Sequence, residues 1–284
     1  MAKILISYGD ERFYESVRRI CRNAKGMKYF DKVKIYTDKD LPLAIKASPC
    51  FNYRRGGGYW MWKPYIVWKT LQMSCENDVI YYVDAGCSLN TESNEWSELE
   101  RLLLGKSALF FQYREDAYEV YPEWSTYIKT KESYSSSIKY WTKPATIEYF
   151  KSYFVDDSFL AYNSLWAGAF VVKNNDEGKL LVKEWFDISL FHPELIMDPL
   201  GKEQLKLPVW FNAHRHDQSI LTLLVCYYKD KLNIRVIYET SESDKKNAAI
   251  RADRYIQAKM NPWLYLKYRL KSFCDEKFKK HTNY

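Results

Sequence analysis

The chain has 284 residues, and its composition of 47% hydrophobic and 28% charged residues is that of a soluble globular protein, which excludes a disordered or collagen-like chain. Aromatic residues reach 17%, a share typical of ring-lined grooves for sugars or of contacts with membrane headgroups. The formal net charge is +7, but segment 263–284 holds six basic residues against two acidic ones, so the rest lacks the basic surface of a general nucleic-acid binder. We therefore expect no nucleic-acid partner.

The six cysteines form no C-x-x-C pair, which favours reduced thiols. The opening residues MAKILISYGDERF lack the apolar stretch of a secretory signal, and no segment approaches the roughly 18 consecutive apolar residues that span a bilayer. We expect a cytoplasmic protein, with peripheral binding to the inner face of the cytoplasmic membrane as the alternative.

Apolar spacing predicts strands that alternate with helices. The first part of the chain is expected to form strands at Lys3 to Tyr8, Val33 to Thr37 and Asp78 to Val83, and helices from Asp10 and from Lys63-Pro64 to about Met73. The second part is expected to form strands at Ala108 to Tyr113 and Leu165 to Val172, and helices at Trp96 to Leu104, Asp176 to Ile188 and Asp217 to Tyr228. This alternation predicts an α/β fold with a mostly parallel central sheet flanked by helices.

Two segments depart from the alternation. Residues 113–160 are polar and aromatic without a clear period, and we interpret them as an insertion over the sheet's edge. We assign residues 1–240 to one domain and 241–284 to a basic helical extension, whose amphipathic helix after Asn261-Pro262 ends the chain. Residues 263–281 are expected either to lie on an anionic membrane or to dock on the body of the protein.

Ligands of open α/β sheets bind beyond the carboxyl ends of the strands, so the residues that follow each strand are candidates for a site. They are Ser7, Tyr8, Gly9, Asp10, Thr37, Asp38, Asp84, Ala85 and Gly86. Asp84 follows an apolar run, where a carboxylate can hold a divalent cation while Ala85 and Gly86 let a diphosphate approach the backbone. The alternative is an Asp that caps the following turn.

Two further clusters carry polar chemistry. Arg54, Arg55 and Lys63 flank three glycines and three aromatic rings just before a helix. Such a segment can bind an anion and stack on a base or sugar, and the alternative is a flexible turn. In the run His214-Arg215-His216-Asp217-Gln218, either histidine is a candidate metal ligand together with Asp84, while Asp217 is also well placed as a helix cap.

The order of these features resembles the GT-A glycosyltransferases, which use nucleotide-sugar donors. The resemblance rests on YYVDAGC around Asp84, LWAGAFVVKNN around Gly168 and HDQSIL around Asp217, and it covers roughly residues 3–230. The segments GGGYWMWKP and RHDQS are similar to those of bacterial enzymes that build capsule or lipopolysaccharide glycans. Glycogenin-like relatives carry Asp-x-Asp at the acidic turn, whereas Gly86 occupies the second acidic position here.

The resemblance implies roles for the candidate residues. Asp84, with His214 or His216 in place of the missing acid, would bind Mn²⁺ or Mg²⁺ and bridge it to the donor diphosphate, helped by Arg54, Arg55 or Lys63. Ala167 and Gly168 would let the sugar lie against the strand, and Asp217 and Gln218 would contact the transferred sugar as the catalytic pair. Ser7 to Gly9 and Thr37-Asp38 would form the nucleoside rim.

The implied function is transfer of a hexosyl or N-acetylhexosaminyl group, with a UDP-sugar favoured, to a glycan or lipid-linked acceptor in bacterial surface polysaccharide synthesis. The glycogenin-like match favours retention of configuration, whereas inversion would need a carboxylate base such as Asp156, Asp157 or Asp217. Because the second Asp is missing, an inactive carbohydrate-binding or assembly protein of the same fold is the alternative. A nucleotidyltransferase ranks last, because Tyr8-Gly9-Asp10-Glu11 is acidic where such an enzyme has a basic, glycine-rich loop.

Overall fold

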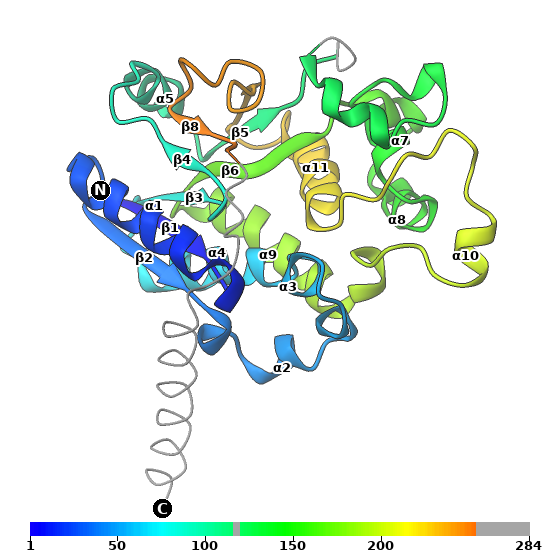
Figure 1. Ribbon diagram of the computed structural model, residues 1–284, viewed down its shortest axis with the longest axis horizontal. Helices are drawn as coiled ribbons and strands as arrows, with labels where there is room; N and C mark the ends of the chain where they lie inside the picture. Colours follow the sequence, from blue (N-terminus) through cyan, green and yellow to red (C-terminus); the bar gives the residue numbers. More distant parts are fainter. Residues whose placement is uncertain (116–119, 254–284) are drawn as a thin grey trace, which may run out of the picture.

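The computed structural model describes residues 1–115 and 120–253, and its centre is a six-stranded sheet (Figure 1). The strand order is β2-β1-β3-β6-β5-β7. In chain order these strands are β1 (Lys3–Tyr8), β2 (Lys32–Tyr36), β3 (Val79–Val83), β5 (Ala108–Gln112), β6 (Leu165–Lys173) and β7 (Ile234–Tyr238). β6 is antiparallel to both of its neighbours and the other three pairs are parallel, so the predicted mostly parallel α/β sheet is confirmed.

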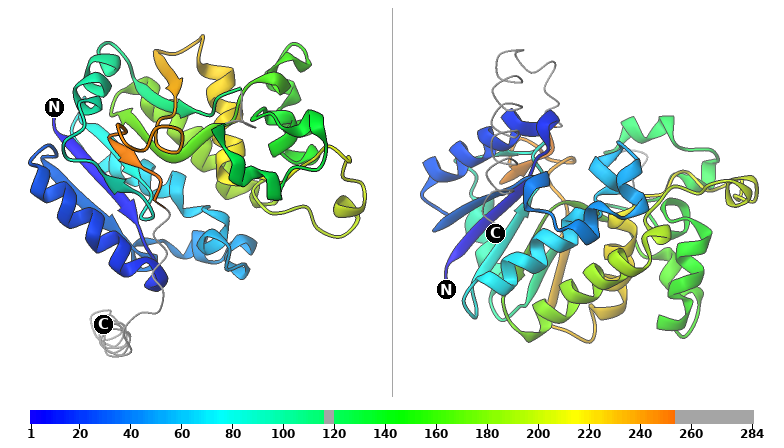
Figure 2. Two further views of the ribbon diagram at one scale, coloured as in Figure 1. Left: turned by 45° about the horizontal axis from the view of Figure 1, so that its top comes forward. Right: turned by 90° about the horizontal axis from the view of Figure 1, so that it is seen from below.

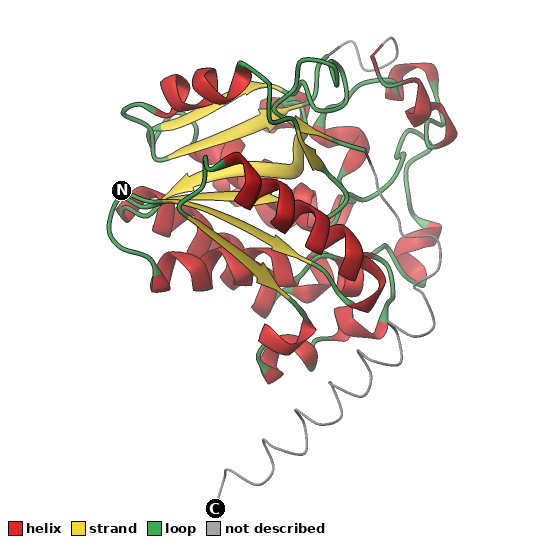
Figure 3. Cartoon of the chain, turned by 60° about the vertical axis from the view of Figure 1, so that its left-hand side comes forward, coloured by secondary structure: helices red, strands yellow, loops and turns green. Residues whose placement is uncertain are grey.

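Helices cover both faces of the sheet (Figure 3). The longer ones are α1 (Tyr14–Met27), α4 (Trp62–Met73), α5 (Glu95–Leu103), α9 (Asp176–Phe191) and α11 (Asp217–Tyr228). Figure 2 shows α4 beside α9 on one face and α1 on the other. The shorter ones are α2 (Leu43–Lys46), α3 (Gly56–Tyr59), α7 (Ile138–Trp141), α8 (Pro144–Phe150) and α10 (Lys202–Leu205). Asp10 caps the turn before α1 as expected, since its side chain accepts a hydrogen bond from the backbone N–H of Arg12.

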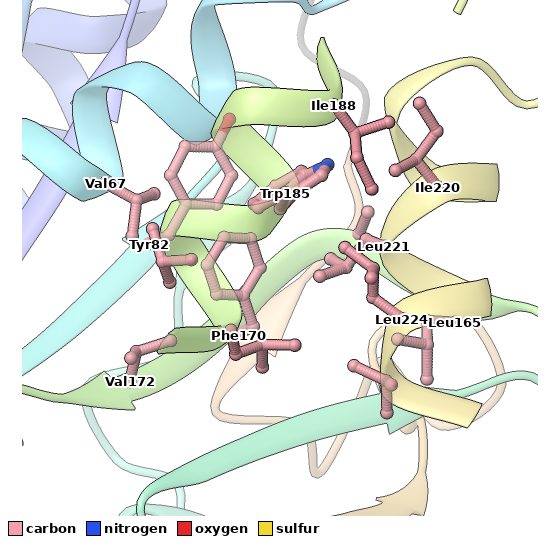
Figure 4. Close-up of a cluster of buried hydrophobic side chains, with 14 of the residues drawn as sticks. Val67, Tyr82, Leu165, Phe170, Val172, Trp185, Ile188, Ile220, Leu221 and Leu224 are labelled. Carbon is pink, nitrogen blue, oxygen red and sulfur yellow. The ribbon is translucent and has the colours of Figure 1, made fainter. Parts of the chain in front are cut away.

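The sheet separates two hydrophobic cores because side chains alternate along each strand. All five residues of β3 are buried, as its apolar run predicts for a strand covered on both faces. Ile80 and Tyr82 face the core formed with α4, α9 and α11 (Figure 4), whereas Tyr81 and Val83 face the core beneath α5. β3 is thereby fixed from both sides, and its carboxyl end is a rigid support for the residues that follow.

The polar, aromatic segment 113–160 contributes short helical turns, including α7 and α8, and no strand between residues 120 and 160. Its rings Tyr121, Trp124 and Trp141 are buried, so this segment adds to the core as well as covering the sheet. Burial of these rings explains how a segment without clear periodicity is held in place.

The structure describes the predicted extension as far as Asp253. β8 (Ile250–Arg251) pairs with β4 (Ser88–Leu89), and Ala248, Ala249 and Ala252 are buried. The helix expected after Asn261-Pro262, with its segment 263–281, lies outside the described residues. Among the helices of residues 1–115 and 120–253, none has the length and hydropathy needed to cross a bilayer.

Candidate functional site

A cavity of about 450 Å³ opens at the carboxyl ends of β1 and β3. Several predicted residues line it: Tyr8, Arg54, Arg55, Asp84, Ala85, Gly86 and Gly168. Asp10, which follows β1, lines it as well. The sequence analysis did not assign a site role to a second group of lining residues: Arg12, Phe13, Cys87, Trp166, Glu242 and Ala252. The last two belong to segment 241–253, so the described part of the predicted extension helps to build the cavity.

Asp84 stands at the centre of this strand edge. Its backbone N–H donates a hydrogen bond of 2.7 Å to the carbonyl of Gly168, which ties the turn after β3 to β6. Oδ1 of Asp84 accepts a hydrogen bond from the hydroxyl of Tyr82, two residues back on β3. One third of the Asp84 side chain is exposed, so a carboxylate of fixed orientation faces the cavity.

Lys63 joins Asp84 to Asp217 behind the cavity. Its Nζ lies 3.5 Å from Oδ1 of Asp84, 3.2 Å from Oδ2 of Asp217 and 3.1 Å from the carbonyl oxygen of Ala167. The side chains of Lys63 and Asp217 are each only 3% exposed. The first turns of α4 and α11 thus bring a buried ammonium and a buried carboxylate to the residue that ends β3.

The electrostatics of this group follow from its burial. Burial raises the pKa of Asp217 to about 6, because the lowering effect of Lys63 does not fully offset the loss of water and the nearby charge of Asp84. Burial acts to lower the pKa of Lys63, but Asp217 and Asp84 outweigh it, so that pKa is raised. Lys63 is therefore a permanent cation at physiological pH.

A left-handed turn forms the wall next to Arg54 and Arg55. Residues 56–60 all have positive φ, with values of 58°, 59°, 93°, 55° and 59°. Glycine occupies the first three positions, whereas Tyr59 and Trp60 adopt this conformation against the preference of L-residues. The turn is closed by hydrogen bonds, such as the one of 2.7 Å from the N–H of Tyr59 to the carbonyl of Arg55. The segment with the three glycines, for which a flexible turn was the alternative, is therefore ordered.

Aromatic rings line the cavity on two sides. Tyr8 and Trp62 stack with their centroids 3.9 Å apart, and the indole N–H of Trp62 donates to the carbonyl of Gly56. On the other side, the indole of Trp166 covers Gly168 so closely that an added Cβ would lie 2.5 Å from the ring. Gly168, the small residue expected to let a sugar lie against the strand, lines the cavity and also makes room for Trp166.

Other predicted residues lie outside the cavity lining. Ser7 is fully buried within β1, and Gly9 packs against Val17. Thr37 and Asp38 begin the turn after β2, where the Thr37 hydroxyl donates to Asp40. Ala167 and Gln218 do not line the cavity. The amide Nε2 of Gln218 is buried without a hydrogen-bond partner among the described residues.

Two of the three acids considered as an inverting base, Asp156 and Asp157, also lie elsewhere. Asp156 accepts a hydrogen bond from the backbone N–H of Ser158, and Asp157 lines a separate cavity with Ser135 and Tyr140. Neither belongs to the cavity of Asp84.

The histidines do not join Asp84 in a metal site. His214 uses Nε2 to bond the carbonyl of Leu195 at 2.8 Å, and its Nδ1 faces the backbone N–H of Lys143 at 3.3 Å. Nδ1 of His216 bonds the carbonyl of Ile196, and its ring stacks on Tyr59. Burial lowers the pKa of His214 well below its usual value and that of His216 to about 4, so both rings are neutral structural groups. This geometry does not support their expected role as ligands.

The remaining donor set does not fit a divalent cation. Asp84 is the one carboxylate of its turn, its Oδ1 already faces Tyr82 and Lys63, and Gly86 offers no side-chain ligand. Across residues 1–115 and 120–253, no group of three or more His, Cys, Asp or Glu side chains is arranged to hold a metal ion. Hard divalent cations need several oxygen ligands, so no chemical step is assigned to a metal here.

Neither a scan of protein-family models nor a search of curated proteins gives a match to this chain. Among solved structures it is similar to a glycosyltransferase involved in glycosylating the major capsid of PBCV-1, with 9% identity over 66% of each chain and a TM-score of 0.37. It is also similar to the galactosyltransferase LgtC in complex with donor and acceptor sugar analogs, with 12% identity over 82% of this chain and 72% of that one and a TM-score of 0.38.

A third similar structure is core-mannan synthase A from Aspergillus fumigatus in its Mn/GDP form, with 8% identity over 84% of this chain and 73% of that one and a TM-score of 0.37. Likeness at this level is too low to transfer an activity or a set of site residues to this chain.

Proposed function

We propose that this chain is a glycosyltransferase that takes its sugar from a nucleoside diphosphate donor. The observation that carries the proposal is one cavity, at the carboxyl ends of β1 and β3, which combines three arginines, three carboxylates and stacked aromatic rings. Arginines recognise a diphosphate, rings stack on a base, and a carboxylate accepts hydrogen bonds from sugar hydroxyls. No single one of these groups points to a sugar nucleotide, but their combination does.

The parts of the cavity suggest a division of labour. Arg54 and Arg55, next to the left-handed turn, would bind the diphosphate and stabilise the charge that develops on it as it leaves. Tyr8 and Trp62 would stack on the base, and Asp84 would orient the sugar. Gln218 has an amide without a hydrogen-bond partner among the described residues, which supports a role beside the sugar after a small rearrangement.

We extend the proposal to transfer of a hexosyl or N-acetylhexosaminyl group from a UDP-sugar to a glycan or lipid-linked acceptor of a bacterial surface polysaccharide. Its support is the sequence resemblance around Asp84, Gly168 and Asp217. Retention of configuration belongs to the same extension, since Asp217 and Gln218 begin α11 as the resemblance implies.

Thermal stabilisation of the purified full-length protein by UDP, GDP, CMP and TDP tests the proposal. A ligand at 100 times its dissociation constant adds about 2.7 kcal/mol to the free energy of unfolding, which a melting curve detects. We expect one diphosphate to stabilise the wild type and to stabilise an Arg54→Gln, Arg55→Gln variant much less. Absence of a shift with every nucleotide would contradict the proposal.

A sugar-binding protein without catalysis is the second candidate. The observation that favours it is that Oδ1 of Asp84 is already engaged by Tyr82 and Lys63. Asp84→Ala separates the two functions, because it abolishes turnover in a transferase but leaves glycan binding nearly unchanged in a binder.

A further inference from the structure

We propose that the ammonium of Lys63 takes the place of the divalent cation at the acidic turn, so that the cavity binds a nucleoside diphosphate without a metal ion. The assignment of the cation position to Lys63 stands on geometry alone. The statement about the nucleoside diphosphate rests on the proposed function. In this account Lys63 is a positioning residue, because it acts on the donor through Asp84.

Three acceptor groups surround Lys63: the carbonyl of Ala167 accepts a hydrogen bond from it, and two carboxylates are its ion-pair partners. Nζ reaches a carboxylate oxygen of Asp84, one of Asp217 and the carbonyl oxygen of Ala167, all within 3.5 Å. It also lies 5.1 Å from the centre of the Tyr82 ring, which adds a cation–π contact. Because the side chain is almost fully buried, water does not compete for these positions.

The backbone fixes the lysine in this place. Lys63 is the second residue of α4, and Pro64 follows it where the missing N–H breaks no helical hydrogen bond. The neighbouring residues Trp62 and Ile66 are buried, so the start of α4 cannot shift without unpacking. The positive charge is thereby built into the framework of the sheet.

The ammonium of Lys63 occupies the side of Asp84 on which Oδ1 could bind a divalent ion. An ion on Oδ1 of Asp84 would meet the ammonium that already lies against the same oxygen, and like charges repel strongly where water is scarce. The turn supplies no second carboxylate, because Gly86 stands at that position. The ammonium of Lys63 offsets one of the two negative charges of Asp84 and Asp217, where a divalent ion would offset both.

This partial offset lowers the repulsion that the cavity exerts on an anion. Asp84 and Asp217 together would repel a diphosphate more strongly without the charge of Lys63 behind them. The exposed guanidinium groups of Arg54 and Arg55 then supply the direct contacts, and Arg55 also faces Asp198 at 3.7 Å. The glycine at position 86 and the burial of Lys63 beside Asp84 are thus two parts of one arrangement.

Binding of Mn²⁺ alone to the full-length protein, followed by the EPR signal of the free ion, tests the cation position. We expect the wild type to have no site tighter than about 1 mM. Lys63→Met leaves Asp84 and Asp217 facing a vacated cation position, and we expect this variant to bind Mn²⁺ at least about tenfold more tightly than the wild type.

Lys143 offers a matched control, since it is also buried and its Nζ lies 3.3 Å from Oε2 of Glu203. Lys143→Met removes a buried lysine elsewhere and should not create a Mn²⁺ site. A wild-type Mn²⁺ site that is tighter than about 1 mM and is removed by Asp84→Asn would overturn the proposal. This comparison of the wild type with Asp84→Asn tests the proposal even if Lys63→Met fails to fold.

Calorimetric titration of UDP and GDP, with EDTA or with Mn²⁺, tests the consequence for the donor. We expect the wild-type affinity to agree within about twofold in the two conditions, and Lys63→Met to bind more weakly in EDTA by about tenfold or more. Binding that requires Mn²⁺ would overturn the inference while supporting the proposed function. If neither nucleotide binds in either condition, the proposed function fails, and the Mn²⁺ titration still decides the cation position.

Discussion

Removal of the Lys63 charge is the most informative test of how the site is held together. Lys63→Met keeps a long, flexible side chain but leaves the buried carboxylate of Asp217 without its cation. Removing one partner of a buried ion pair typically costs about 3–5 kcal/mol, because the remaining charge is buried and uncompensated. For a chain of this size, such a loss lowers the melting temperature by roughly 6–15 °C.

The pH dependence of this effect has a definite sign. Without Lys63, the pKa of Asp217 rises further above its already raised value, so the carboxyl group of the variant becomes neutral at higher pH. The destabilisation should therefore be largest near pH 7.5 and shrink toward pH 5. Adding Asp217→Asn to Lys63→Met should restore part of the lost stability at pH 7.5.

Urea denaturation followed by tryptophan fluorescence measures these free energies. The surface pair Lys183–Asp187 on α9 provides the control, since Lys183→Met at an exposed ion pair should cost less than about 1 kcal/mol. If Lys63→Met were as stable as Lys183→Met at pH 7.5, the buried ion pair would not contribute as its geometry implies.

Four further predictions follow from the same structure. The pKa of Asp217 is raised from 3.8 to about 6, so the stability it contributes is full below its ordinary pKa and is lost as the pH rises through about 6. Relative to Asp217→Asn, the wild type should lose about 3 kcal/mol of unfolding free energy between about pH 4 and pH 7, and parallel pH curves would contradict this. Gly26→Ala in α1, where a Cβ meets nothing within 4 Å, should stabilise by about 0.5–1 kcal/mol. Gly56→Ala should instead lower the melting temperature, because Gly56 has a φ of 58° and an added Cβ would lie 2.3 Å from the Trp60 ring. A variant with the melting temperature of the wild type would show that the left-handed turn does not contribute to stability. Arg54→Gln and Arg55→Gln should each weaken diphosphate binding by about tenfold or more, measured by calorimetry, and unchanged affinity would remove them from the donor site.

Much of the fold was predictable because its elements have strong local patterns. The strand β3 and the helix α11 are both more apolar than surface elements, and the cap at Asp10 is a local interaction. β7 was not anticipated, since its burial is only partial and its pairing with β5 depends on distant residues. The antiparallel direction of β6 is likewise set by the path of segment 113–160, which has no clear period.

The candidate site was predictable where a residue directly follows a strand, as Asp84 does. The partnership of Lys63 with Asp84 and Asp217 joins three separate elements, and no spacing in the sequence reports it. The histidines were interpreted as ligands from their chemistry. In the fold the carbonyls of Leu195 and Ile196 each bond one nitrogen of a histidine ring, and Nε2 of His216 faces Asp198 at 3.8 Å. Gly168 was expected to leave space for a sugar. Only the packing in the fold shows that the ring of Trp166 lies against it.

The measurement that tests the central claim most directly is release of nucleoside diphosphate from a panel of UDP- and GDP-sugars by the full-length protein, with glycan and water as acceptors. The account predicts release from at least one donor, with loss of release in Asp84→Ala and in the Arg54→Gln, Arg55→Gln variant. No release from any donor by a protein that still binds the free nucleoside diphosphate would contradict a transferase and favour the sugar-binding alternative.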